Sequence, residues 1–379
     1  MPTGAQAGRS RLYTDGVFAT ATGRAKFAST PYKAPAEAID ARYPFRLNTG
    51  RLRDQWHAMS RTGTIAQLYN HAPEPSIALT PDDLAKRGFK SGDLVRVESR
   101  RGAAILMVEA SDELKPGHAF IAMHWGARFL GGSSSLGVNT LTIAAIDPQS
   151  KQPELKHAAV RITAAALSWR LVAVARPIHG SAIALADRLS PLMQKFAFAS
   201  VVLTGRDREA VLFRVAANHA PDDVELNELD RLLGLQGADI IRYDDPKRAI
   251  GRRMALSDDA LVALRLSGSV GNGFDPTAAQ VWLRDWLVRG APVTAIRRYL
   301  LAPTAAAPAG YSARGQIVCN CFDVSATEID ATLAELSGPP EARLAALQSR
   351  RSCGTHCGSS LPELKARVRA VVALQPTAA

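Results

Sequence analysis

The four cysteines of the 379-residue chain are the side chains best suited to bind a metal. One residue separates the first two, three separate the last two, and 31 lie between the pairs, at Cys319, Cys321, Cys353 and Cys357. Four thiolates suit either Zn²⁺ or an iron–sulfur cluster. Because zinc sites usually space their ligands as Cys-x2-Cys, the Cys-x-Cys pair favours a cluster. Zinc and purely structural thiols remain open on spacing alone.

A second group of chemistry-bearing side chains follows the strand-like segment YPFRL. Residues 48–63, NTGRLRDQWHAMSRTG, hold three arginines, a histidine, hydroxyl side chains and glycines. Arginine forks and the backbone N–H groups of glycine turns are natural partners of a pyrophosphate. A solvated basic loop is the alternative, because charge clusters are common on protein surfaces.

A series of motifs in one order carries a resemblance to a known family. TGRLRDQWHAMSRT is followed by GDLVRV, then MHW, then VNTLT, and finally DPQSKQPELK. This series resembles the molybdopterin-dinucleotide-binding domain at the C-terminus of molybdenum oxidoreductases. The resemblance implies a six-stranded double-psi β-barrel that closes over the pterin cofactor, molybdopterin guanine dinucleotide.

The same resemblance implies which residues contact that cofactor. Arg51 and Lys156 would supply positive charge, and Asn139 would hydrogen-bond a pterin edge. His57 and His124 could equally be core residues with satisfied ring nitrogens, and Arg53 beside Asp54 could be only a surface pair. The implied cofactor contacts are Thr49, Gly50, Arg51, Trp56, His57, Ser60, Thr62, Asn139 and Lys156.

The cysteine region carries its own resemblance. VCNCFDVSATEID, followed by SCGTHCGSSLPELKARV, is similar to the bacterioferritin-associated-ferredoxin-like (BFD-like) [2Fe-2S] module. Cys319, Cys321 and Cys357 match its ligand positions, whereas the fourth position holds Ser360. We expect Cys353 to supply the fourth sulfur and Ser360 to cap a helix, with serine-oxygen ligation left open. His356, between the last two cysteines, is expected to be a loop residue.

The order of a dinucleotide domain, a spacer and such a module resembles the C-terminal part of bacterial assimilatory nitrate reductase. The resemblance implies that electrons enter at the [2Fe-2S] cluster from a ferredoxin, a flavodoxin or an NADH-dependent reductase, and that molybdenum reduces nitrate to nitrite. The family's [4Fe-4S] motif and molybdenum domains are not in this sequence, and no cysteine precedes Cys319. We therefore expect the chain to need an N-terminal catalytic half and to be inactive alone.

An alternative function is a stand-alone iron–sulfur or zinc module that binds a redox partner, with a vestigial cofactor domain. The sequence leaves open whether the chain comes from a split gene or is a fragment, and it leaves the electron donor and the oligomeric state undetermined. It also leaves the role of residues 166–300 open between a packing spacer and a docking surface.

Composition narrows the class of protein. Hydrophobic residues make up 47% and charged residues 21%, which suits folded domains with ordinary cores. The net charge is +11, and residues 1–170 hold 22 basic against 14 acidic side chains, so an anionic ligand is expected there. With 6% aromatics and no long basic run, nucleic-acid binding is not expected. No apolar stretch of 18 residues and no leader pattern is present, so a cytoplasmic protein is expected.

The predicted fold class is multidomain: a double-psi-like β-barrel, a mixed α/β spacer and a small helical [2Fe-2S] module. The predicted parts are a lead-in at 1–40, the dinucleotide-binding domain at 41–165, the spacer at 166–300, an Ala/Pro linker at 301–314 and the cluster module at 315–379. Within the lead-in, turn dipeptides at 15–16 and 22–23 allow a hairpin.

Local patterns predict the elements. Alternating apolar residues at 93–99, followed by 104–108 and 118–123, predict a meander of strands, and a capped helix is expected at 81–88. The spacer should contain strands at 171–175 and 200–204 and helices at 183–196 and 275–290. Capping boxes at 325–328 and 360–363 predict two of the three helices of the tail, with another at 340–350.

Overall fold

The computed structural model describes residues 11–29, 31–132, 137–154, 156–271, 275–302 and 306–374. The chain forms two compact units, Met1–Ala36 and Glu37–Ala379. Among its described residues the first unit contains turns and no strand, so the predicted hairpin is wrong. Gly16 and Gly23 do adopt left-handed turn conformations, with φ of 71° and 68°. An isolated two-stranded hairpin is marginal in water because it has little apolar surface to bury.

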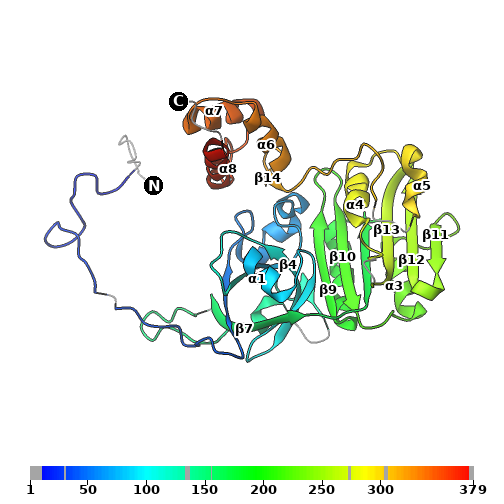
Figure 1. The fold of residues 1–379 in the computed structure, drawn as a ribbon, viewed down its shortest axis with the longest axis horizontal. Coiled ribbons are helices and arrows are strands. Elements are labelled where there is room, and N and C mark those ends of the chain that lie inside the picture. The colour runs from blue at the N-terminus through cyan, green and yellow to red at the C-terminus, as the bar shows by residue number, and fades with distance from the viewer. Residues whose placement is uncertain are drawn as a thin grey trace. The chain divides into compact units, whose positions relative to one another are not determined.

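The N-terminal part of the second unit forms a closed six-stranded barrel (Figure 1), which confirms the expected barrel. The strands follow one another around it in the order β1-β5-β2-β4-β3-β7. Leu47, Ile77 and Ile121 are fully buried on three of them and belong to one core. The strands are β1 (Phe45–Gly50), β2 (Ser76–Leu79), β3 (Leu94–Glu98), β4 (Ala103–Ala110), β5 (His118–Ala122) and β7 (His157–Ala164).

The predicted meander is only partly right. β3 and β4 pair antiparallel as expected, but β2 lies between β4 and β5, parallel to the first and antiparallel to the second. Three of the four β2 residues are buried, so this strand shows no alternating pattern and the sequence does not reveal it. Helix α1 (Pro81–Arg87) is confirmed, with the Thr80 side chain accepting from the Asp83 N–H and Gly88 ending it at φ 69°.

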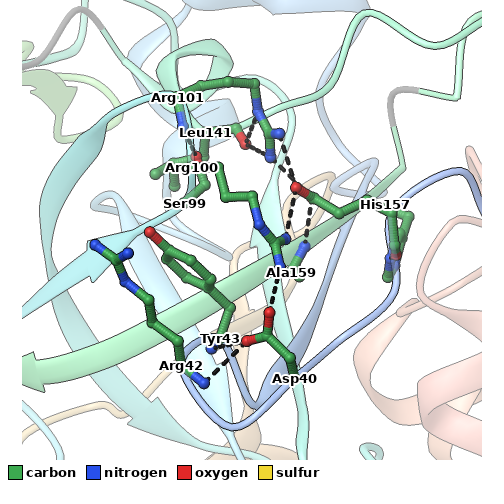
Figure 2. A network of polar contacts seen from close by, with 10 residues as sticks. Asp40, Arg42, Tyr43, Ser99, Arg100, Arg101, Leu141, His157 and Ala159 are labelled. Carbon is green, nitrogen blue, oxygen red and sulfur yellow. Dashed lines mark hydrogen bonds and ion pairs between the residues drawn. The ribbon is translucent and has the colours of Figure 1, made fainter.

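The Glu37 carboxylate is the main link between the segment before β1 and the barrel. Glu37 accepts hydrogen bonds from Arg100 and from both terminal nitrogens of Arg101, each at 2.9 Å, and from the Ala159 N–H at 2.9 Å. Figure 2 shows Arg100, Arg101 and Ala159 at this network, with Asp40 bound to the same Arg100. Hydrogen bonding from Arg101, against the opposing effect of burial, lowers the pKa of Glu37 to about 2.

We predict that Glu37→Ala lowers the free energy of unfolding by about 3 kcal/mol, because it leaves two guanidinium groups without their shared partner. The folded-state pKa of Glu37 lies below its ordinary value of 4.5. Its contribution is therefore complete above that value and is lost as the pH falls toward about 2. Urea unfolding of both proteins at pH 7 and pH 3 checks this. A difference that grows toward low pH would contradict the account.

The spacer is one antiparallel sheet with helices packed on it, ordered β11-β12-β13-β8-β10-β9-β6 (Figure 1). This confirms mixed α/β content, although β6 comes from the barrel region. A bidentate pair between Arg214 of β10 and Glu74, at 2.7 and 3.0 Å, ties the sheet to the segment before β2. The strands are β6 (Leu130–Gly131), β8 (Trp169–Ala175), β9 (Phe198–Thr204), β10 (Ala210–Ala217), β11 (Ile241–Asp245), β12 (Ile250–Ser257) and β13 (Ala260–Ser269).

Two predicted spacer helices are shorter than expected. α2 stops before Pro191, which cannot donate to the helix ladder, and the chain continues as a 3₁₀ turn. Asp275 bonds the N–H and hydroxyl of Thr277 in a turn, and the next helix starts four residues beyond Pro276 and ends at Gly290 as expected. The helices are α2 (Ala182–Leu189), α3 (Asp223–Leu233), α4 (Gln280–Arg289) and α5 (Arg297–Leu300). Short 3₁₀ turns span His57–Met59, Thr62–Thr64, Ala66–Tyr69, Val138–Thr140, Ser190–Lys195, Pro246–Arg248 and Thr294–Ile296.

The C-terminal module has a small core of its own, separate from that of the barrel and sheet. The first predicted capping box forms, with Ser325 and Glu328 bonding each other's backbone N–H groups. The second does not form, because the Ser360 hydroxyl is buried with no hydrogen-bond partner. No described helix is long and apolar enough to cross a bilayer. The elements are β14 (Ile317–Cys319), β15 (Val324–Ser325), α6 (Ala326–Ala334), α7 (Pro340–Arg351) and α8 (Leu361–Leu374).

Candidate functional site

Seven of the nine predicted cofactor residues lie on one continuous segment that begins at the end of β1. The Gly50 carbonyl accepts from the Met123 N–H at 2.8 Å, next to the end of β5. A Cβ on Gly50 would come within 2.8 Å of the Phe120 ring, so a larger residue at this position would have to displace that ring. Thr49 is buried, and its N–H donates to the Lys156 carbonyl at 3.4 Å. Beyond Gly50 the chain leaves the barrel as residues 51–71, which we call the cofactor segment.

Three side chains of the cofactor segment form an exposed cluster. Arg51 approaches the His57 Nε2 at 3.2 Å, and its guanidinium lies 5.9 Å from the centre of the Trp56 ring. The Trp56 and His57 rings meet edge to face at 4.7 Å. Trp56 remains 49% exposed, which is unusual for so large an aromatic side chain. A cation and a flat apolar ring, both open to solvent, can receive an anionic ligand that carries a planar ring system.

Backbone strain and hydroxyl bonds hold this cluster in place. Ala58 and Met59 both adopt left-handed backbone conformations, with φ of 48° and 55°. Two consecutive non-glycine residues in this region are costly, and such strain concentrates at ligand sites. Met59 is buried and anchors the turn, while the Thr62 hydroxyl accepts from the Trp56 N–H at 3.0 Å and donates to Gln55 at 2.6 Å.

The remaining predicted cofactor residues have different surroundings. Ser60 is exposed at the end of the first 3₁₀ turn, where its N–H donates to the His57 carbonyl at 3.1 Å. Asn139 is exposed on the Val138–Thr140 turn. A hydrogen bond from the Val138 N–H to the Trp125 carbonyl, at 2.9 Å, holds this turn in place. Lys156 is exposed just before β7, the antiparallel neighbour of β1. The structure thus brings Lys156 to β1 and Asn139 to the end of β5, beyond the cofactor segment itself.

His124 is a buried polar residue that the sequence leaves open between a cofactor contact and a core position. Its side chain is fully buried, and neither ring nitrogen has a hydrogen-bond partner. The expectation of satisfied ring nitrogens is therefore wrong for this histidine. Burial, together with the nearby charges of Arg51 and His57, lowers its pKa below the ordinary 6.5. Because an unpaired buried imidazole is costly, these nitrogens are available for a ligand bound at the same cluster.

We predict that His124→Leu raises the stability of the ligand-free chain by about 1 kcal/mol, since it removes two unpaired polar atoms. The natural chain should lose stability as the pH falls below 6.5, because protonation of His124 is easier after unfolding. The variant should lose less over the same range. Thermal unfolding between pH 7.5 and 5.5 measures both effects, and a destabilised variant would show that the ring packs as an ordinary core residue.

The cysteines lie on two loops of the C-terminal module. Cys321 and Cys357 place their sulfur atoms 3.2 Å apart, whereas Cys319 and Cys353 are buried. All four are free thiols. Across the part of the chain that the structure describes, no three His, Cys, Asp or Glu side chains are already grouped as a metal site. The donor set nevertheless suits a soft metal, because thiols from two loops meet. The Ser360 hydroxyl, close by in the chain, is buried without a hydrogen-bond partner.

The thiols differ in acidity. Burial, followed by the charge of Cys319, raises the pKa of Cys353 to about 11. Burial and hydrogen bonding with Cys357 raise the pKa of Cys321. Hydrogen bonding with the side chain and the backbone of Ser359 lowers the pKa of Cys357. Cys357 is also the most exposed of the four thiols, so it is the one most accessible to a reagent.

Arg53 and Asp54 are not a surface pair. Their side chains are only 19% and 9% exposed, and both contact the cysteine loops of the C-terminal module. Arg53 donates to Glu363 at 2.6 Å, and Asp54 accepts from the Asn320 amide at 3.0 Å. Sequence spacing carries no signal for these contacts, because Arg53 and Glu363 are 310 residues apart.

Comparison with known proteins agrees with the barrel assignment. Residues 45–159 match the Molydopterin dinucleotide binding domain. The chain is 31% identical over 342 residues to a nitrate reductase of Klebsiella oxytoca, covering 88% of this chain and 35% of that protein. It is 46% identical over 153 residues to a nitrate reductase of a Synechocystis strain, covering 40% of this chain and 21% of that protein. A nitrate reductase of Shewanella frigidimarina is 36% identical over 173 residues, covering 40% and 18%.

The chain thus spans about a third or less of the length of these relatives. The domain match covers the strands of the barrel from β1 into β7 and includes every predicted cofactor residue from Thr49 to Lys156. Together, these matches show that the barrel region is similar to the Molydopterin dinucleotide binding domain and that the chain is similar to part of several nitrate reductases.

Proposed function

We propose that the chain forms the C-terminal part of a molybdenum-dependent assimilatory nitrate reductase, where it binds molybdopterin guanine dinucleotide and a [2Fe-2S] cluster. The observation that carries the proposal is the exposed cluster of Arg51, Trp56 and His57 beside a buried His124 without partners, inside the matched domain. That arrangement has the charge, the flat apolar surface and the unused hydrogen-bonding groups that a pterin dinucleotide requires.

In this proposal, different residues of the site bind different parts of the cofactor. The Arg51 guanidinium and the Lys156 ammonium provide positive charge for the diphosphate, and the exposed Trp56 ring offers a surface for stacking. His124 offers its ring nitrogens, and Asn139 offers an amide from the turn held beyond the end of β5. When bound, the dinucleotide supplies the molybdenum centre at which nitrate takes up two electrons and two protons and yields nitrite and water.

The hydroxyl residues have more than one role in this proposal. Ser60 is exposed and remains free to donate to a phosphate, whereas Thr62 already accepts from Trp56 and donates to Gln55. Thr62 therefore orders the cofactor segment, and its contribution to binding is through Trp56. Thr49 and Gly50 set the direction in which that segment leaves the barrel.

The thiol side chains of the cysteine loops are of the kind that binds a [2Fe-2S] cluster. We propose that Cys319, Cys321, Cys353 and Cys357 bind the cluster, which supplies one-electron transfer when present. Cys353 is the proposed fourth ligand. Because the Ser360 hydroxyl does not cap α8, its oxygen is the competing ligand that experiment must distinguish.

The proposed enzyme needs further protein. The catalytic half corresponds to the part of the relatives that this chain does not match, so nitrate reduction is expected only when the two halves are together. A ferredoxin, a flavodoxin or an NADH-dependent reductase is the proposed electron donor. Four unpaired thiols suit a reducing compartment, and we propose the cytoplasm.

Capture of the cofactor tests the proposal. Molybdopterin guanine dinucleotide released from a denatured donor molybdoenzyme is incubated anaerobically with the full chain and separated by gel filtration. The pterin is then oxidised and measured by fluorescence in the protein fraction. We expect about one pterin per chain. Elution of all pterin with the small molecules would overturn the cofactor-binding role.

A further inference from the structure

The cofactor segment carries two sets of side chains with different partners. Arg51, Trp56 and His57 contact one another in the exposed cluster. Arg53 and Asp54 lie between them in the sequence, yet their bonds run to the loops that hold the cysteines. A single seven-residue stretch therefore touches both proposed cofactor sites.

The Asp54 carboxylate contacts both cysteine loops at once. One oxygen accepts from the Asn320 amide at 3.0 Å, and the other accepts from the Ser359 hydroxyl at 3.1 Å. Asn320 lies between Cys319 and Cys321, and the Ser359 hydroxyl is 3.2 Å from the sulfur of Cys357. Asp54 thus fixes the spacing between the first and second cysteine loops.

Arg53 adds a second set of bonds to the same loops. It donates to Glu363 at the start of α8, at 2.6 Å, and to the carbonyl of Val318, the residue before Cys319. Although burial opposes it, hydrogen bonding from His71 and the charge of Arg53 lower the pKa of Glu363 to about 2. Glu363 is therefore ionised at neutral pH and able to hold the guanidinium.

Two further residues complete the attachment of the first cysteine loop. Arg206, after β9, donates to the carbonyls of Asn320 and Cys321 at 2.9 and 3.2 Å. Gln67, also in the cofactor segment, donates to the Asn320 carbonyl. Charge-assisted bonds of this kind are among the stronger hydrogen bonds in proteins, and most of these atoms are sheltered from water.

We propose that Arg53 and Asp54 are positioning residues that clamp the two cysteine loops onto the cofactor segment. The clamp holds the electron-entry site at a fixed place beside the dinucleotide site, instead of leaving it free on the Ala/Pro linker. The role of the clamp in electron entry rests on the proposed function, whereas the clamp itself is inferred from the contacts alone.

Thiol labelling of the metal-free full chain tests the clamp. Iodoacetamide modification of each cysteine is followed by mass spectrometry, with the exposed Cys357 as the internal reference. In Asp54→Asn and in Arg53→Gln, we expect Cys319 to react about tenfold faster, because a charge-assisted bond that closes its loop is lost. Cys353, two residues beyond the end of α7 and in the module core, should keep its rate. Asp54→Glu should restore slow labelling of Cys319.

Asp187→Asn is the matched control, because Asp187 forms an exposed ion pair with Arg128 at 2.8 Å on α2. Unchanged Cys319 rates in both clamp variants would overturn the proposal. Equal acceleration of Cys319 and Cys353 would also overturn it, since that pattern reports unfolding of the whole module. A chain that never contains iron would refute the proposed function without altering this result, whereas an iron-loaded chain with unchanged labelling would refute only the clamp.

Discussion

Replacing Cys321 and Cys357 together with serine is expected to remove essentially all iron from the anaerobically purified chain, from about two irons to nearly none. These two thiols come from different loops, and their sulfur atoms already lie 3.2 Å apart. A cluster that bridges the two loops loses one ligand from each loop in this variant, so the chain should not retain it. Iron and sulfide analysis, with the visible spectrum, measures the loss.

Two single variants then decide the fourth ligand. Cys353→Ala should lose the cluster, and Ser360→Ala should keep it. The reverse result would assign the buried Ser360 oxygen as the ligand and refute the assignment of Cys353. Full retention of iron in the double variant would show that the metal does not bind these loops at all.

The second large effect concerns the dinucleotide site. We expect Arg51→Ala to weaken binding of GDP, the guanosine diphosphate part of the cofactor, by about 10- to 100-fold. Arg51 is the exposed cation of the cluster, and its removal also takes away the contact over the Trp56 ring. Arg51→Lys should give an intermediate affinity, because it keeps the charge but loses the planar fork.

Isothermal titration calorimetry with GDP measures these affinities. Arg188→Ala, which removes an exposed arginine from α2, serves as the control for loss of net charge. Equal weakening by Arg51→Ala and Arg188→Ala would indicate a general effect of charge. In that case the basic surplus, and not a built site, would account for the binding.

Local sequence patterns predicted the elements that depend on local physics. The alternating residues of β3, the Thr80 cap of α1 and the capping box of α6 all follow from side chains within a few residues of one another. The sequence missed β2 because that strand is buried on both faces. The helix predicted at 183–196 is too long because the apolar periodicity continues past Pro191, before which α2 ends.

The candidate site was predictable only in part, for a similar reason. The motif resemblance pointed to residues such as Arg51 and Trp56, which lie close together in the chain. It could not reveal that His124 is buried without partners, because burial depends on the closed barrel. Nor could it show that Arg53 and Asp54 bind loops some 300 residues away, since such contacts depend on how the module packs.

The most direct test of the account is the metal content of the natural chain, purified without oxygen. Iron, sulfide and zinc are measured together with the visible spectrum and the electron paramagnetic resonance spectrum after dithionite reduction. We predict about two irons and two sulfides per chain and a rhombic S = 1/2 signal. Stoichiometric zinc without a chromophore, or a metal-free chain, would contradict the electron-entry role and leave only cofactor binding.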